Sequence, residues 1–292
     1  LGADPGVATA IPFPMAPEAT VTAVQVIPMT SPQDAQTEAL LVRMRADIIP
    51  PVETAAGLTA YVGGVLAITS DFSTVLTDAL PVFLLVVIGF GFLALVLLFR
   101  SILVPLTGVV TSLLSLAAAM GLTVAVFQWG WGAELLGVSS TGPIMPFLPI
   151  MVFAILFGLS MDYQVFLVSR MQEEWGHTQD NDKAVRRGLA ASGRVVMIAA
   201  AIMISVFSAF VLGDEPTIKL FGLALASAVL FDAFVIRLII VPSVMYQFGR
   251  ANWWMPGWLG RILPKVSVES EEDAEIEAAE IDDIPDDELL AD

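Results

Sequence analysis

The sequence predicts a polytopic α-helical membrane protein in which five spans follow a small α+β segment. Apolar residues make up 57% of its 292 residues, and the mean hydropathy is +0.81. Several apolar runs reach the roughly 18 residues that a membrane-crossing helix needs. These observations exclude a globular enzyme with an apolar core.

The five expected spans are separated by turns and polar segments. We expect them at Val82–Phe99, Leu103–Phe127, Ile150–Ser169, Val195–Leu212 and Ile218–Val241. Arg100 and Ser101 are expected to form a tight turn between the first two spans. The segment before the third span is rich in Gly, Trp and Pro and contains no Lys or Arg. Its Trp129 and Trp131 suit a membrane interface.

Basic residues predict the orientation, because Lys and Arg concentrate on the cytoplasmic side of membrane proteins. With five spans, three basic regions fall on one side: the first turn, the loop after the third span and the segment after the fifth. Their basic residues are Arg100, Arg170, Lys183, Arg186, Arg187, Arg194, Arg250, Arg261 and Lys265. We therefore expect a multi-pass protein of the cell (plasma) membrane with an extracytoplasmic N-terminal segment and a cytoplasmic C-terminal tail.

The chain divides into three expected segments. Residues 1–78 form a β-α-β unit of soluble character, residues 79–250 form the five-span membrane domain, and residues 251–292 form an acidic cytoplasmic tail. From Glu269 to Asp292 there are 13 acidic residues and no Lys or Arg. Without them, 13 basic residues face 17 acidic ones, so most of the net charge of -17 belongs to the tail. We expect the tail to be disordered.

Local patterns predict the elements of the first segment. Residues 1–19 are expected to be loop, and Thr20–Pro28 is expected to be a strand because β-branched residues alternate along it. Ser31 is expected to cap a helix that stops at Pro50. Leu58–Val65 is expected to be a second strand. The chain starts without Met or a signal peptide, and we expect a missing N-terminal part to precede it.

Composition also limits the chemistry. The chain has no Cys, which excludes disulfides and thiolate metal sites. The glycines Gly57, Gly63 and Gly64 lack the spacing of a phosphate-binding loop. The single His, His177, lies in the basic loop and is expected to be a surface residue. We find no zinc, heme, nucleotide or serine-nucleophile pattern, and we expect no cofactor, no metal and no nucleic-acid partner.

Asp162 places a carboxyl group near the middle of the third span. It precedes Arg170 by eight residues, about 12 Å at ~1.5 Å per helical residue. A charge at that depth is costly, so an intramembrane Asp is a functional-site hypothesis. It can load and unload a proton, and the hydroxyl of adjacent Tyr163 can hydrogen-bond a carboxylate on a neighbouring helix. The alternative is that Asp162 only joins helices through a buried hydrogen bond.

Asp232 in the fifth span is the second intramembrane carboxylate. Arg237 lies five residues on, about 140° around an α-helix, so the two are not expected to face each other. We expect Arg237 to anchor the helix by reaching toward the cytoplasmic surface. Asp232 is expected to give structural or electrostatic support, with direct proton handling as the alternative. Ser160 and Gln164 form a further polar pair, one helical turn apart.

Four stretches together resemble the C-terminal half of an MMPL family transporter of the RND superfamily. They are FGLSMDYQVFLVSRMQEEW from Phe157, KAVRRGLAASGRVV from Lys183, VLGDEPTIKLFGLALA from Val211 and FDAFVIRLIIVPSVM from Phe231. The resemblance covers about residues 20–250, and the combination is more specific than any one stretch.

The resemblance implies twelve spans in two repeated halves, each half with an extracytoplasmic porter domain after its first span. This chain then corresponds to the end of the second porter domain and the last five spans of an RND-type bundle. The Asp162-Tyr163 pair is implied to meet a matching Asp-Tyr pair of the missing N-terminal half, forming a proton relay. Gly158 is implied to allow close approach of that helix, and Ser160 to support the pair.

The implied function is export of lipids or other hydrophobic molecules, driven by the proton gradient rather than by a cofactor. The implied partners are the lipid bilayer, a hydrophobic or lipid substrate and the missing half, with a homo-oligomer as a further possibility. The identity of the substrate stays open.

Two other classes of protein are alternatives. Intramembrane aspartyl proteases resemble Tyr-Asp in one span and Gly-x-Gly-Asp in another. Here the order is Asp162-Tyr163, and Leu230 and Phe231 precede Asp232 without glycine. A non-transporting sterol-sensing or receptor-like protein of related topology is the second alternative, and the intact Asp-Tyr pair argues against it.

Overall fold

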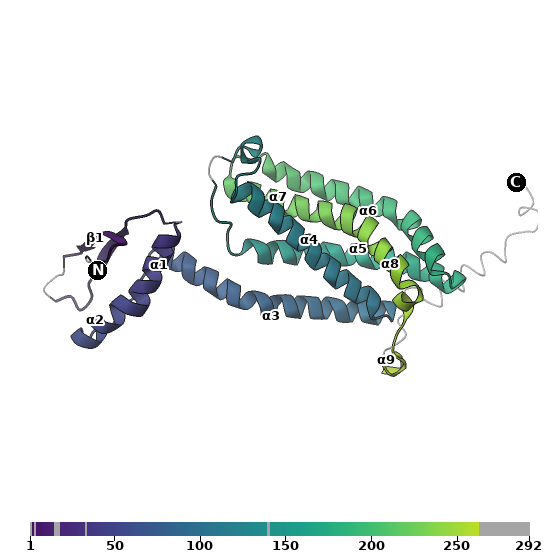
Figure 1. The fold of residues 1–292 in the computed structure, drawn as a ribbon, viewed down its shortest axis with the longest axis horizontal. Helices are drawn as coiled ribbons and strands as arrows, with labels where there is room; N and C mark the ends of the chain where they lie inside the picture. Colours follow the sequence, from purple (N-terminus) through teal and green to yellow (C-terminus); the bar gives the residue numbers. More distant parts are fainter. Residues whose placement is uncertain (1, 3, 15–17, 33, 139–140, 263–292) are drawn as a thin grey trace, which may run out of the picture.

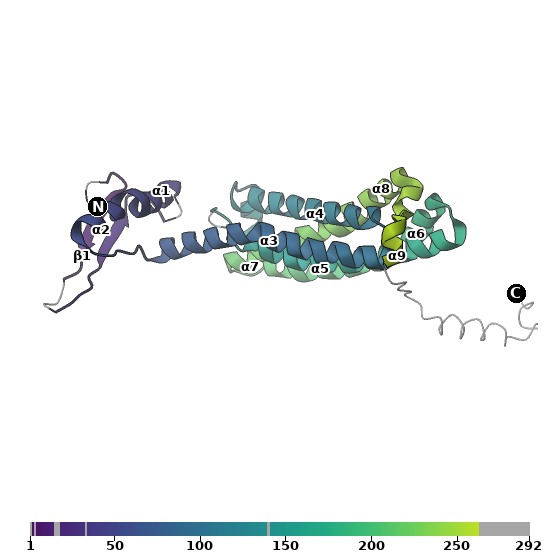
Figure 2. The ribbon, with the colours of Figure 1, turned by 90° about the horizontal axis from the view of Figure 1, so that it is seen from below.

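The computed structural model describes residues 2, 4–14, 18–32, 34–138 and 141–262. Within these ranges, five helical stretches are long and apolar enough to cross a membrane. They run side by side as an elongated bundle, and a small N-terminal unit lies beyond one end of it (Figures 1 and 2). The predicted fold class is confirmed. The disordered tail expected over residues 251–292 is wrong in its first part, which is largely helical up to Ile262. The rest of the expected tail, including its acidic part from Glu269 to Asp292, lies outside the described residues.

All five predicted spans are found; the second has the predicted bounds, and the other four are longer than the apolar runs. They are α3 (Val65–Phe99), α4 (Leu103–Phe127), α5 (Leu148–Thr178), α6 (Asn181–Val211) and the stretch Pro216–Trp253. The last stretch consists of α7 (Pro216–Leu230), the π-helix η3 (Phe231–Ile240), α8 (Val241–Phe248) and the 3-10 helix η4 (Gly249–Trp253). A 3-10 turn, η2 (Ala133–Leu136), precedes α5, and α9 (Gly257–Ile262) follows η4. Hydropathy identifies only the part of a helix that lipid surrounds. It therefore does not predict polar extensions of a helix, such as the end of α5.

The N-terminal unit begins with a β-hairpin instead of a loop. β1 (Val7–Pro12) pairs antiparallel with β2 (Val24–Pro28). The expected loop over residues 1–19 is therefore wrong, whereas the strand expected over Thr20–Pro28 is present in its second half. A strand gains its stability from a neighbour, and β1 supplies one that its own mixed Pro and Ala composition did not indicate.

The helical part of this unit starts and ends later than expected. It consists of α1 (Ala35–Arg43), η1 (Met44–Ile48) and α2 (Ile49–Ala56). The N-cap is Asp34, whose side chain accepts a hydrogen bond from the backbone N–H of Gln36, rather than Ser31. Pro50 does not stop the helix, because it falls in the first turn of α2, where proline is tolerated.

The second strand expected over Leu58–Val65 is wrong, so the unit is not β-α-β. Gly57 ends α2 in a left-handed conformation (φ 64°), the next residues are irregular, and Val65 already begins α3. Two glycines, Gly63 and Gly64, interrupt the segment, and glycine weakens a strand because it has no side chain to pack.

α3 connects the N-terminal unit to the bundle as one continuous helix. Its 35 residues span about 52 Å, more than the ~30 Å hydrocarbon core of a bilayer. The helix therefore projects from the bundle toward the N-terminal unit (Figure 1). There the guanidinium of Arg45 in η1 binds the carboxylate of Asp71 in α3 with both terminal nitrogens, Nη2–Oδ2 being 2.8 Å.

The basic regions lie at the other end of the bundle, in the α3–α4 turn, around the α5–α6 turn and in the segment after α8 (Figure 1). Asn252 in η4 donates to Asn181 at the start of α6 (Nδ2–Oδ1 3.2 Å). Arg100, at the α3–α4 turn, donates to the carbonyl of Gly260 in α9 (2.8 Å). The C-terminal segment therefore holds the α3–α4 and α5–α6 turns together.

Glycines allow the closest helix contacts in the bundle. A Cβ on Gly188 of α6 would lie 2.6 Å from the Cγ of Met171 and 2.8 Å from its backbone in α5. A Cβ on Gly222 of α7 would lie 2.9 Å from the carbonyl oxygen of Phe207 in α6. Small residues at such positions let neighbouring backbones approach each other.

We expect Gly188→Ala to destabilise the protein by about 1–3 kcal/mol, because the added methyl group forces α5 and α6 apart. Gly176→Ala is the matched control in α5, since nothing lies within 4 Å of its added Cβ. Thermal unfolding in detergent should show a lower midpoint for Gly188→Ala alone. Equal midpoints for the two variants would contradict this packing.

Candidate functional site

A buried ion pair lies in the last helical stretch. Nε of Arg237 is 3.1 Å from Oδ2 of Asp232, and the two side chains are 1% and 2% exposed. Both belong to the π-helix η3. A π-helix bonds each residue to the fifth one along the chain, so residues five apart come to lie on the same side. The expectation that Arg237 reaches the surface and does not face Asp232 is therefore wrong, because it assumed α-helical geometry.

The remaining donors of Arg237 point at α5. Nη1 donates to the amide oxygen of Gln164, and Nη2 donates to the carbonyl and hydroxyl oxygens of Ser160. A buried charge is tolerated when its other hydrogen-bonding groups are also satisfied. Arg237 thus joins η3 to α5 at the two positions of the predicted polar pair.

The other carboxylate oxygen of Asp232 is bound by hydroxyl groups. Oδ1 accepts from Oγ of Ser115 in α4 and from Oγ of Ser160 in α5, both at 3.1 Å. Ser112 of α4 also contacts Ser160, with 2.9 Å between the hydroxyl oxygens. We call the six residues of this cluster the Asp232–Arg237 network: Ser112, Ser115, Ser160, Gln164, Asp232 and Arg237.

The roles of Ser112 and Ser115 were not predicted. Both are buried, and they lie three residues apart in the apolar run of α4. That spacing puts two hydroxyls on one helix face, and hydroxyls inside a membrane bundle find a partner on a neighbouring helix. The spacing was therefore the signal, although it could not have identified Asp232 as the partner.

Asp162 lies on a different side of α5 from the network. It belongs to a row of exposed residues, three or four apart along one helix face, which we call the Asp162 face: Met151, Ala154, Gly158, Asp162, Phe166 and Arg170. A Cβ built on Gly158 meets nothing within 4 Å. Tyr163 is partly buried and packs against the cluster that contains Val196 and Val229.

The structure therefore divides the predicted site residues between two sides of α5. Ser160 joins Asp232 in the buried network. Asp162 and Gly158 lie on the exposed face, and Tyr163 packs toward α6 and α7. The two intramembrane carboxylates are not brought together, and each has its own surroundings.

Among the described residues, no group of three or more His, Cys, Asp or Glu side chains could hold a metal ion. The Asp232–Arg237 network contains one carboxylate, one guanidinium, hydroxyls and an amide, and Asp162 adds a second carboxylate within the bundle. Of these groups, a carboxylate can bind and release a proton, and a hydroxyl can donate and accept hydrogen bonds beside it.

These features define a polytopic α-helical membrane protein with ionisable groups inside its bundle. Comparison with known proteins identifies the particular family. A sequence model of the MMPL family matches residues 16–266, and the chain belongs to this family. Its members are transporters.

Three relatives illustrate the similarity. The chain is 43% identical over 252 residues to membrane protein YdfJ of Bacillus subtilis, covering 86% of this chain and 34% of that protein. It is 40% identical over 235 residues to heme uptake protein MmpL11 of Mycobacterium tuberculosis, covering 80% and 24%. It is 34% identical over 240 residues to trehalose monomycolate exporter MmpL3 of the same species, covering 82% and 25%. The chain thus spans a quarter to a third of the length of these relatives.

We expect Arg237→Met to destabilise the protein by about 3–5 kcal/mol, because it leaves the Asp232 carboxylate buried without its cation. The double variant Asp232→Asn with Arg237→Gln is the control. It keeps polar side chains at both positions and removes both charges, so its loss should be smaller. Thermal unfolding in detergent measures both, and a double variant as unstable as Arg237→Met would argue against the pairing.

Proposed function

We propose that this chain is part of a transporter that exports lipids or other hydrophobic molecules across the cytoplasmic membrane, driven by the proton-motive force. The observation that carries the proposal is the two-sided arrangement of α5. One side presents the Asp162 carboxylate on an exposed face, and the other binds the buried Asp232–Arg237 network through Ser160 and Gln164. A change of charge at Asp162 can therefore reach two further helical segments, α4 and η3.

The Asp162 face has the properties of a helix interface. A carboxylate facing lipid would be costly. Gly158 and Ala154, one and two turns before Asp162, are small enough for another helix to approach closely. Because the chain spans only part of its relatives' length, we propose that the other half of the protein supplies this helix, with its own Asp-Tyr pair.

Asp162 is the better candidate for the proton carrier. Asp232 has a guanidinium at 3.1 Å and two hydroxyl donors, so its negative charge is balanced within the bundle. No such contact holds Asp162 among the described residues. We propose that Asp162 changes its protonation state during transport, that Tyr163 assists it, and that Asp232 supports the fold electrostatically.

We propose that α5 transmits the change in protonation of Asp162 to the helices packed against it. When Asp162 gains or loses a proton, its attraction to the facing helix changes and α5 shifts. Ser160 and Gln164, two residues to either side of Asp162, hold Arg237, so the shift reaches η3. The projecting part of α3, which is bound to the N-terminal unit by the Arg45–Asp71 pair, connects that unit to the bundle.

The names of relatives support a large, mostly apolar substrate. MmpL3 is named for a mycolate lipid, and MmpL11 is named for heme. One name says exporter and the other says uptake, so the direction of transport rests on the resemblance to lipid exporters. We propose that the proton gradient supplies the energy and that no cofactor takes part.

Asp162→Asn in the full-length protein should abolish transport without loss of folding. Asn keeps the shape of the side chain and can hydrogen-bond, but it cannot ionise. Tyr163→Phe should reduce transport, and Asp232→Asn should be milder than Asp162→Asn. The measurement is substrate export into or out of liposomes under an imposed proton gradient, with thermal stability measured in parallel.

Normal transport by Asp162→Asn would reject proton coupling at this residue. A variant that misfolds would support the purely structural role of Asp162. A folded, membrane-inserted wild-type protein that moves neither protons nor lipid would favour the non-transporting receptor-like alternative.

We propose that the N-terminal unit is extracytoplasmic, because the basic turns lie at the opposite end of the bundle. A single cysteine in place of Leu135, in the α4–α5 connection, should then be labelled by an impermeant thiol reagent from outside the cell. One in place of His177, near the α5–α6 turn, should be labelled only from inside. Both residues are exposed, and labelling of both from the same side would disprove the five-span orientation.

A further inference from the structure

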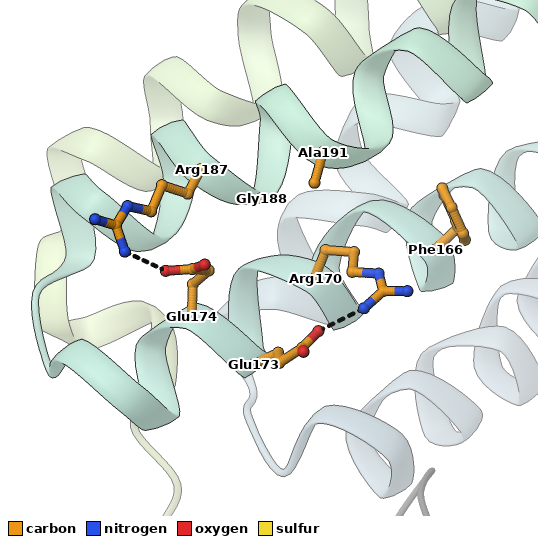
Figure 3. A pocket seen from close by; sticks show the side chains of 7 residues that line it. All are labelled: Phe166, Arg170, Glu173, Glu174, Arg187, Gly188 and Ala191. Atoms are coloured by element: carbon orange, nitrogen blue, oxygen red, sulfur yellow. Dashed lines mark hydrogen bonds and ion pairs between the residues drawn. The ribbon is translucent and has the colours of Figure 1, made fainter. Parts of the chain in front are cut away.

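A cavity of about 250 Å³ lies between α5 and α6 near their shared turn (Figure 3). It is lined by Phe166, Arg170, Glu173 and Glu174 of α5 and by Arg187, Gly188 and Ala191 of α6. The α6 wall carries only a methyl group at Ala191, and Gly188 lies in close contact with Met171 of α5. Two ion pairs also hold the charged groups in place: Arg170–Glu173 at 2.8 Å and Arg187–Glu174 at 3.2 Å.

The cavity continues the Asp162 face. Phe166 follows Asp162 by four residues, and Arg170 follows Phe166 by four, so all three lie in one row along α5. Each step is about 6 Å along the helix axis. Phe166 is the member of this row that separates Asp162 from the charged part of the cavity.

The charges of the cavity suit water better than a fixed ion. Its two arginines and two glutamates cancel, and each arginine already has a carboxylate partner. The space holds several water molecules, each of which occupies about 30 Å³ in the liquid. Water in such a cavity can hydrogen-bond to four charged groups.

We propose that this cavity is the hydrated cytoplasmic mouth of the proton path to Asp162 and that the ring of Phe166 forms a hydrophobic constriction between them. The inference rests on the proposed role of Asp162 as proton carrier. A proton moves between the Asp162 carboxylate and a water chain that ends in the cavity. An apolar ring at a constriction blocks water, and hence protons, until the helices shift.

Cysteine labelling in the full-length transporter tests this placement directly. The chain has no Cys, so with any cysteine outside it replaced, Asp162→Cys is the one thiol present. In inside-out vesicles, a small methanethiosulfonate reagent should modify it slowly. Phe166→Ala should raise the rate about tenfold or more by widening the constriction, and Phe166→Trp should lower it.

Ala154→Cys is the matched control, because it lies on the same exposed face two turns on the other side of Asp162. Its modification rate should not respond to Phe166→Ala. Ala191→Cys, on the α6 wall of the cavity, should react from the cytoplasmic side regardless of residue 166. If Phe166→Ala does not fold, Phe166→Leu replaces it, with the same direction of change expected.

Three results would overturn the proposal. One is an unchanged rate at position 162 when Phe166 is reduced in size. Another is an equal increase at position 154, which would mean general loosening of the helix. The third is an unreactive Ala191→Cys, which would mean that another part of the protein fills the cavity. The transport assay of Asp162→Asn tests the proposed function separately. A failure of the proposed proton path can therefore be told apart from a failure of proton coupling at Asp162.

Discussion

The ion pair between Asp232 and Arg237 is the interaction on which the bundle depends. A charged side chain at the centre of a membrane helix costs about 2.5–3.5 kcal/mol or more, so neither residue would be tolerated alone. The pair is stable here because hydroxyls from α4 and α5 and the amide of Gln164 satisfy the remaining donors and acceptors. Three helical segments therefore have to keep one register, and the π-helix that aligns the pair is part of that requirement.

This constraint gives α5 its central position. Ser160 and Gln164 of α5 bind Arg237 in the buried network, while Asp162 between them faces away from the network. Fixing one side of the helix leaves the other side free to meet a partner. An ionisable group on a helix that is firmly attached to its neighbours can move those neighbours when its charge changes.

The sequence predicts the bundle well and the site in part. Hydropathy identifies all five spans, because lipid imposes a length and an apolar composition on each. The mid-span position of Asp162 likewise follows from helix rise alone. The pairing of Asp232 with Arg237 could not be predicted, since a residue spacing of five indicates contact only in a π-helix. The hairpin was missed for a related reason: strand pairing depends on a distant segment, and the pattern within β1 is weak.

The most direct test of coupling between Asp162 and the network is difference infrared spectroscopy of the full-length protein during a pH titration. Labelled aspartate and labelled arginine report on the two groups separately. We expect the carboxyl signal of Asp162 and the guanidinium signal of Arg237 to change with one common midpoint, and both changes to vanish in Asp162→Asn. An arginine signal that stays constant while Asp162 titrates, or the same carboxyl titration in Asp162→Asn, would contradict the account.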